Sequence, residues 1–228
     1  MKDSSAVIVA VSLGAIFALA LSAPTVLSGY PALGGQGGLL FGGMPMMSVQ
    51  GQTVTVDQAI QMMKNVPAYA SVSPSNNTIT FASREVVLVV LATDHEGALN
   101  LTGRQSPSYA TDDVFVIYGL INPTLVIPHG AVAQVTVVNL DKDMYHNFVV
   151  TTASPPYSYM AIQGMMMNWQ QQQGIAQMMP FLPPANNAQG VAHEYVYSVA
   201  LNTQTTLWYL CTYPGHAQAG MYGEVLVN

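Results

Sequence analysis

The chain has 228 residues and carries little charge, because Asp, Glu, Lys and Arg together make up 7% of it, against about 25% in ordinary soluble proteins. With 5 Lys and Arg residues and a formal charge of -6 at pH 7, it offers no basic cluster for phosphates, which excludes nucleic acid as a partner. A chain that omits charges of both signs has few salt bridges to lose in acid, so the composition favours an acidic environment. A surface covered by membrane or neighbouring proteins is the alternative.

Residues 1–27 are expected to form a membrane anchor or a signal segment. The stretch from Ala6 to Ser22 carries no charge and is long enough for either role, and in both roles it would export the rest of the chain. Small residues at 20–23 suit cleavage, whereas the length of the apolar run favours a retained anchor. We therefore expect a single-pass cell-membrane protein with an extracytoplasmic domain, with secretion after cleavage as the alternative. Residues 28–52 are rich in glycine and uncharged, which predicts a flexible tether.

Residues 53–228 are expected to form one folded domain. In its N-terminal extension, residues 53–77, Thr55 and Gln58 predict the capped start of a short helix that ends before Pro67. From Thr78 onward, short runs of β-branched and aromatic residues alternate with turn residues, which predicts an all-β, antiparallel β-sandwich. The expected strands lie within residues 78–83, 85–93, 114–120, 124–130, 131–140, 146–151, 193–201, 205–210 and 223–228.

A segment rich in Met, Gln and Pro, residues 157–190, interrupts this series of strands. Its methionines could serve as soft ligands for Cu(I) or as an adaptable docking surface. Compositional bias alone is weak evidence, so we favour the alternative that the insertion is a long loop covering one end of the sandwich.

Cys211 is the single cysteine, so it cannot form a disulfide within the chain. It could be a buried inert thiol, an intermolecular bridge, a nucleophile or a metal ligand. His216 lies five residues after Cys211 and Met221 five residues after His216, all in the loop between two expected strands. Pro214 and Gly215 supply the turn that brings these soft and borderline donors to one end of the sandwich.

His146 is the best candidate for a fourth donor, because it begins a strand after a polar turn and can reach the same end. His146, Cys211 and His216 would give two imidazoles and one thiolate, with Met221 as a weak axial ligand. That donor set is typical of an electron-transfer copper site. The remaining histidines lack a partner motif and are interpreted as surface or loop residues: His95, His129 and His193.

The stretches "NLDKDMYHNFVVT" and "LWYLCTYPGHAQAGM" resemble the ligand motifs of the cupredoxins, the small blue copper proteins. The apolar N-terminus, the tether and the sparse charge are most similar to sulfocyanin, the blue copper protein of acidophilic archaea. The resemblance implies a Greek-key sandwich that binds one mononuclear copper ion through His146, Cys211, His216 and Met221. It also implies that Asn147 hydrogen-bonds across to the ligand loop near Thr212.

The expected function is that of a one-electron carrier on the outer face of the cell membrane, and not an enzyme. Its expected partners are respiratory redox proteins, and we expect a monomer. An extracytoplasmic copper-binding or copper-delivery protein that uses the insertion is the alternative. A multicopper oxidase is excluded because the chain has no His-x-His pair, and a binuclear copper centre because it has one cysteine. Nucleophilic catalysis by Cys211 is disfavoured, since an exported free thiolate would oxidise.

Overall fold

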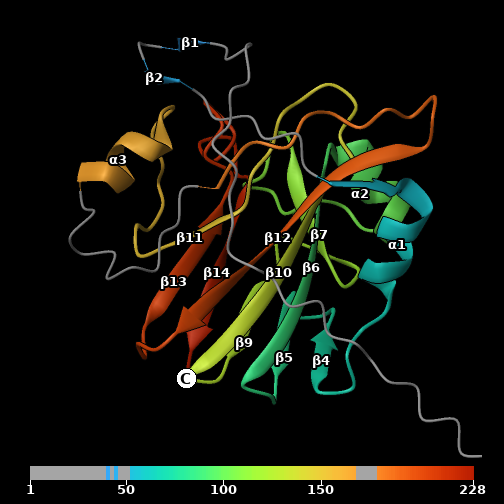
Figure 1. The fold of residues 1–228 in the computed structure, drawn as a ribbon. Coiled ribbons are helices and arrows are strands. Elements are labelled where there is room, and N and C mark those ends of the chain that lie inside the picture. The colour runs from blue at the N-terminus through green and yellow to red at the C-terminus, as the bar shows by residue number, and fades with distance from the viewer. Residues whose placement is uncertain (1–39, 42–43, 46–51, 168–178) are drawn as a thin grey trace, which may run out of the picture. The chain divides into compact units, whose positions relative to one another are not determined.

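The computed structural model describes residues 40–41, 44–45, 52–167 and 179–228 (Figure 1). The expected anchor, most of the tether and the middle of the insertion lie outside these ranges. Within the described part of the chain, no helix is long and apolar enough to cross a membrane. Leu40–Phe41 (β1) and Met44–Pro45 (β2) form a small antiparallel pair.

Two six-stranded sheets make up the rest of the described β structure. The first sheet has, in spatial order, β3 (Gln52–Thr55), β12 (Val191–Leu201), β10 (Ala131–Asn139), β6 (Glu85–Thr93), β7 (Val114–Ile117) and β8 (Leu120–Ile121). The second has β11 (Val149–Thr151), β13 (Thr206–Leu210), β14 (Tyr222–Val227), β9 (Thr124–Ile127), β5 (Thr78–Phe81) and β4 (Ala70–Ser73). The two-sheet, mainly β architecture is the predicted one.

Alternating side chains form the core between the two sheets. In β10, Ala133, Val135 and Val137 are buried while Val132 and Gln134 are exposed, as expected for a strand with one face inward. Apolar residues of both sheets belong to one continuous buried cluster. This core fixes the two sheets against each other and so fixes the loops at their ends.

The prediction of a purely antiparallel sandwich is wrong, because both sheets are mixed. β10 pairs with β6 in parallel, and β9 pairs in parallel with both β14 and β5. Strand pairing direction depends on how the connections cross the ends of the sandwich, which runs of β-branched residues do not encode. The uninterrupted burial of β6 from Leu88 to Thr93 is typical of a strand covered on both faces.

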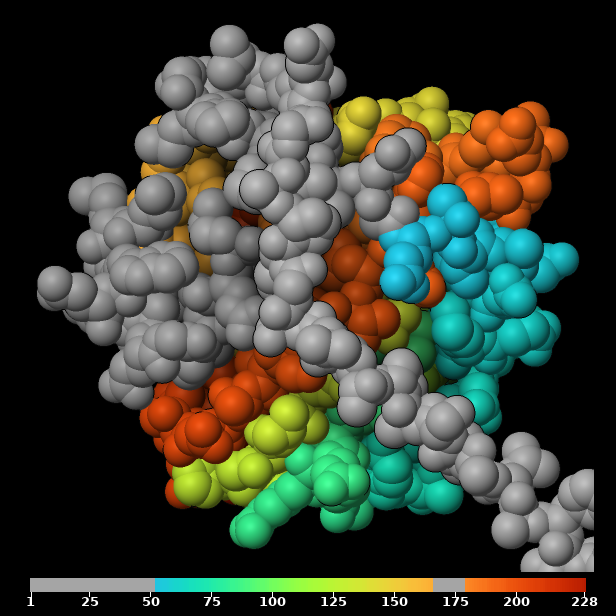
Figure 2. Space-filling view, viewed as in Figure 1, coloured from blue at the N-terminus to red at the C-terminus, as the bar shows by residue number. Residues whose placement is uncertain are grey.

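The N-terminal extension contributes more than the predicted helix. Thr55 and Gln58 form the predicted capping box at the start of α1 (Val56–Lys64), which ends before Pro67. The extension also supplies β3, which pairs with β12, and β4, which pairs with β5. In Figure 2 the cyan surface of α1 lies next to the orange surface of the later chain. The extension therefore adds an edge strand to each sheet.

Two short helices were not predicted: α2 (His95–Thr102) and α3 (Ala161–Met167). α2 is capped by Asp94, whose side chain accepts from the Gly97 amide at 2.6 Å, and by Gly103 in the left-handed region. Ala98 is its one buried side chain, so the sequence shows cap residues without the apolar periodicity that reveals a helix. α3 lies within the insertion and packs against the end of the sandwich that carries Cys211.

Candidate metal centre

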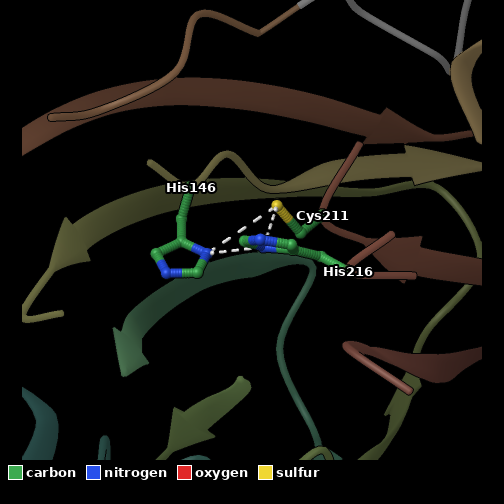
Figure 3. A group of neighbouring side chains, drawn as sticks. All are labelled: His146, Cys211 and His216. Atoms are coloured by element: carbon green, nitrogen blue, oxygen red, sulfur yellow. Dashed lines mark hydrogen bonds between the residues drawn. The ribbon is translucent and has the colours of Figure 1, made fainter. Parts of the chain in front are cut away.

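Three of the predicted ligands meet in space although they come from distant parts of the chain (Figure 3). His146 lies just before β11, Cys211 directly follows β13, and His216 lies in the loop between β13 and β14. The Nδ1 atoms of the two imidazoles are 3.2 Å apart, and Cys211 Sγ is 3.8 Å from His146 Nδ1 and 3.6 Å from His216 Nδ1. All three side chains are buried.

This triangle of donor atoms has the size of a metal site. The point equidistant from the three atoms lies about 2 Å from each, close to usual bond lengths from a metal to imidazole nitrogen and thiolate sulfur. Two imidazoles and one thiolate form the trigonal donor set of blue copper sites. Together with Met221, these residues fit a single mononuclear copper ion.

Backbone hydrogen bonds fix the loop that carries three of these residues. The Cys211 amide donates to the Met221 carbonyl at 3.1 Å, and the Met221 amide donates to the His216 carbonyl at 2.9 Å. Gly220 has a φ of +104° and lies so close to Ala110 that a Cβ there would collide with its backbone. These hydrogen bonds hold the loop in one conformation, and Gly220 packs it tightly against the backbone of Ala110.

Met221 is fully buried in the core cluster that also includes Cys211. Its backbone contacts place it beside both other loop ligands. Its role as a weak axial ligand stays a prediction.

Asn147 connects His146 to the ligand loop, as predicted. Its Oδ1 accepts from the Thr212 amide at 2.8 Å, and its Nδ2 donates to Thr212 Oγ1 at 2.8 Å. Nδ2 also lies 2.9 Å from the Met179 carbonyl, to which it donates. One buried amide thus joins β11, the ligand loop and the insertion.

Aromatic side chains support the site from the core side. Phe115, Phe148 and Tyr209 contact one another with ring centroids 4.9 to 5.8 Å apart. Tyr209 also donates through its hydroxyl to the Pro123 carbonyl at 2.7 Å. Phe148 follows Asn147 in the chain and Tyr209 lies two residues before Cys211, so this packing holds both ligand-bearing strands in place.

The described ends of the insertion cover the metal centre. Leu182 exchanges both backbone hydrogen bonds with His146, at 2.8 and 3.2 Å. Phe181 packs edge-on against Tyr213, whose ring centroid is 4.7 Å from that of His216. His216 is consequently only 3% exposed. For its described residues, the insertion behaves as the loop covering one end of the sandwich that we favoured.

Two buried aspartates beside the ligands were not predicted from the sequence. The Oδ2 atoms of Asp113 and Asp141 each lie 3.7 Å from His146 Nε2, and Asp113 Oδ2 also lies 3.7 Å from His216 Nδ1. Burial, followed by the charge of Asp141, raises the pKa of Asp113 to about 8. Burial alone would raise the pKa of Asp141, but the imidazole of His146 beside it and the hydrogen bonds from the amides of Asp143 and Met144 lower that pKa to about 2.

Burial also shifts the pKa of His146, Cys211 and His216, in each case in the direction that favours the neutral side chain. It lowers the pKa of His146, and together with the charge of His146 it lowers the pKa of His216 to about 3. It raises the pKa of Cys211 to about 12. The imidazoles are therefore ready to bind metal over a wide pH range, whereas the thiol must release its proton to bind.

The other histidines do not join this centre within the described part of the chain. His129 is exposed in the turn between β9 and β10, where its Nε2 lies 2.7 Å from the Asn202 carbonyl, and His95 begins α2. His193 lies inside β12 and is half-buried.

Comparison with known proteins agrees with this geometry. Residues 122–228, which include all four predicted ligands, match the copper binding proteins of the plastocyanin/azurin family. Rusticyanin from Acidithiobacillus ferridurans is 29% identical over 154 residues, which cover 68% of this chain and 69% of that protein. A rusticyanin from Acidithiobacillus ferrooxidans has the same identity, over 83% of its length. A solved structure of reduced rusticyanin shares 25% identity with a TM-score of 0.56, covering 78% of this chain and 99% of that one.

A mixed two-sheet β-sandwich with two histidines and a cysteine converging at one end defines a blue copper protein. Over residues 122–228 the chain is similar to the cupredoxins, the plastocyanin/azurin family of copper-binding proteins, and the rusticyanin relatives agree with that match.

Proposed function

We propose that this protein carries single electrons and is not an enzyme. The observation that carries the proposal is the buried triangle of His146, Cys211 and His216. Copper held there supplies a one-electron couple, since thiolate favours Cu(I) and imidazole serves both oxidation states.

The protein's contribution is to hold these three side chains in one arrangement. Asn147 ties the ligand loop to the strand that comes after His146, and the Met221 backbone closes that loop on Cys211 and His216. Residues held by packing and hydrogen bonds on a sheet scaffold move little when the charge of the site changes. A small rearrangement is what fast electron transfer requires.

We further propose that the carrier works on the outer face of the cell membrane, exchanging electrons between respiratory redox proteins as a monomer. The uncharged stretch from Ala6 to Ser22 and the glycine-rich residues 28–52 support an anchor and a tether. The scarcity of charge in the whole sequence supports an acidic surrounding, as in the sulfocyanins that the sequence resembles.

Voltammetry of the copper-loaded protein tests electron transfer against copper delivery. We expect one copper ion per chain, a reversible one-electron wave, and Cu(I) that resists removal by a competing chelator. His146→Ala should abolish the wave, while the control His129→Ala, which changes an exposed histidine, should leave it unchanged. Ready loss of Cu(I) to the chelator without a reversible wave would instead favour copper delivery.

A further inference from the structure

The imidazole of His146 faces two different environments through its two nitrogens. Nδ1 faces Cys211 Sγ and His216 Nδ1 at 3.8 and 3.2 Å. Nε2 faces the Oδ2 atoms of Asp113 and Asp141, each at 3.7 Å. Asp113, Asp141 and His146 form a second cluster, in which each side chain is at least nine-tenths buried. This cluster shares His146 with the metal triangle, and Asp113 Oδ2 also lies 3.7 Å from His216 Nδ1.

Among the residues that the structure describes, His146 Nε2 is buried without a hydrogen-bond partner, and so is Asp113 Oδ2. A distance of 3.7 Å exceeds that of a direct hydrogen bond, but a slight rotation of the ring or of a carboxyl group would close it. Because an unpaired buried N–H is unfavourable, the carboxyl oxygens are its natural acceptors.

The two carboxyl groups are held in place by different parts of the fold. Asp141 Oδ1 accepts from the amides of Asp143 and Met144 at 2.7 and 2.9 Å, so the turn before His146 leaves Oδ2 facing the imidazole. Asp113 immediately precedes β7, so it comes from a different segment of the chain than Asp141. The pair therefore restrains His146 from two directions.

We infer that Asp113 and Asp141 are positioning residues that keep the proton of His146 on Nε2 and leave the Nδ1 lone pair directed at the metal site. A neutral imidazole carries one proton, and acceptors on one side of the ring hold it there. Carboxylate partners of metal-binding histidines orient the ring in this way, and losing them typically weakens metal binding 10- to 100-fold. The inference rests on the metal site but not on electron transfer.

The test uses the full chain labelled with ¹⁵N, metal-free and loaded with Zn(II), a redox-inactive probe. Nitrogen chemical shifts report which nitrogen of His146 is protonated. Asp113→Leu removes one acceptor. Asp141→Asn can keep its oxygen on the turn amides and so present an NH₂ group to Nε2. The exposed neighbours provide matched controls, Asp112→Asn and Asp143→Asn.

We expect the wild-type chain and both controls to carry the proton on Nε2 and to bind one Zn(II) with equal affinity. The Asp113→Leu/Asp141→Asn double variant should move the proton partly or wholly to Nδ1 and weaken Zn(II) binding 10- to 100-fold. If the double variant does not fold, Asp141→Asn alone decides on the same two readouts.

Three results would overturn the inference. One is a wild-type His146 protonated on Nδ1. Another is a folded variant, shown by circular dichroism, whose tautomer and Zn(II) affinity equal those of the wild type. The third is a second Zn(II) bound per wild-type chain that disappears in the double variant, because the carboxyl pair would then be a ligand set. A failure of electron transfer would change none of these readouts.

Discussion

At the scale of single residues, Met221 is the ligand whose role most needs a direct test. It is buried in the core and its backbone hydrogen-bonds Cys211 and His216. A thioether donates weakly and favours Cu(I). We predict that Met221→Gln, with a harder oxygen donor, lowers the reduction potential, and that Met221→Leu, with no donor, raises it. Voltammetry that is unchanged in both variants would remove Met221 from the coordination sphere.

The ligands could be predicted from the sequence because their identities and spacing carry the information. Cys211, His216 and Met221 lie in one short loop. His146 begins an expected strand, at the end of the sandwich where that loop also lies. The link from Asn147 to Thr212 was implied by the same family resemblance and is confirmed.

The two aspartates beside His146 could not be predicted. Asp113 lies 33 positions before His146 and has an exposed aspartate as its neighbour, while Asp141 stands in a polar turn where charged residues are usually solvated. Only the folded structure shows that both are buried beside His146.

At the scale of elements, the ligand loop depends on close packing at Gly220. A side chain there would adopt a φ of +104° and collide with the backbone of Ala110 and Tyr109. We predict that Gly220→Ala lowers the free energy of unfolding by about 2 to 4 kcal/mol, from left-handed strain plus overpacking. Denaturant titration measures the loss.

Gly130 is the matched control, because its φ is +78° but an added Cβ would meet nothing within 4 Å. Gly130→Ala should cost only the conformational strain, about 1 kcal/mol. Equal losses for the two variants would show that the contact with Ala110 does not matter for stability.

Most strands were predictable at this scale, whereas their pairing was not. The apolar run of Glu85–Thr93 identifies β6 as a strand, but not its parallel partner β10. β3 and β4 have four residues each and few apolar side chains, so pairing with β12 and β5 rather than local sequence makes them strands.

At the scale of the whole molecule, the response to acid is set by a few buried groups, because the chain has only 11 Asp and Glu residues. The pKa of His216 is lowered to about 3 and that of His146 is also lowered. Both therefore bind protons more readily in the unfolded chain, and the stability present above pH ~6.5 is lost as pH falls. Asp113, with its pKa raised to about 8, has the opposite effect and favours the folded state in acid.

For the metal-free protein we therefore predict a shallow loss of stability between about pH 6.5 and 4. Two histidines that take up protons on unfolding and one aspartate that releases a proton leave a net uptake of about one proton. This corresponds to about 1.4 kcal/mol per pH unit at most. Denaturant titrations at several pH values measure the slope. Stability that rises on acidification would contradict these assignments.

The central claim is that Cys211 is the thiolate ligand of a blue copper site, and an absorption spectrum tests it most directly. The copper-loaded oxidised protein should be intensely coloured through sulfur-to-copper charge transfer, and Cys211→Ser should remove that colour while far-ultraviolet circular dichroism shows the sandwich intact. Intense colour that persists in the folded Cys211→Ser variant would contradict the claim.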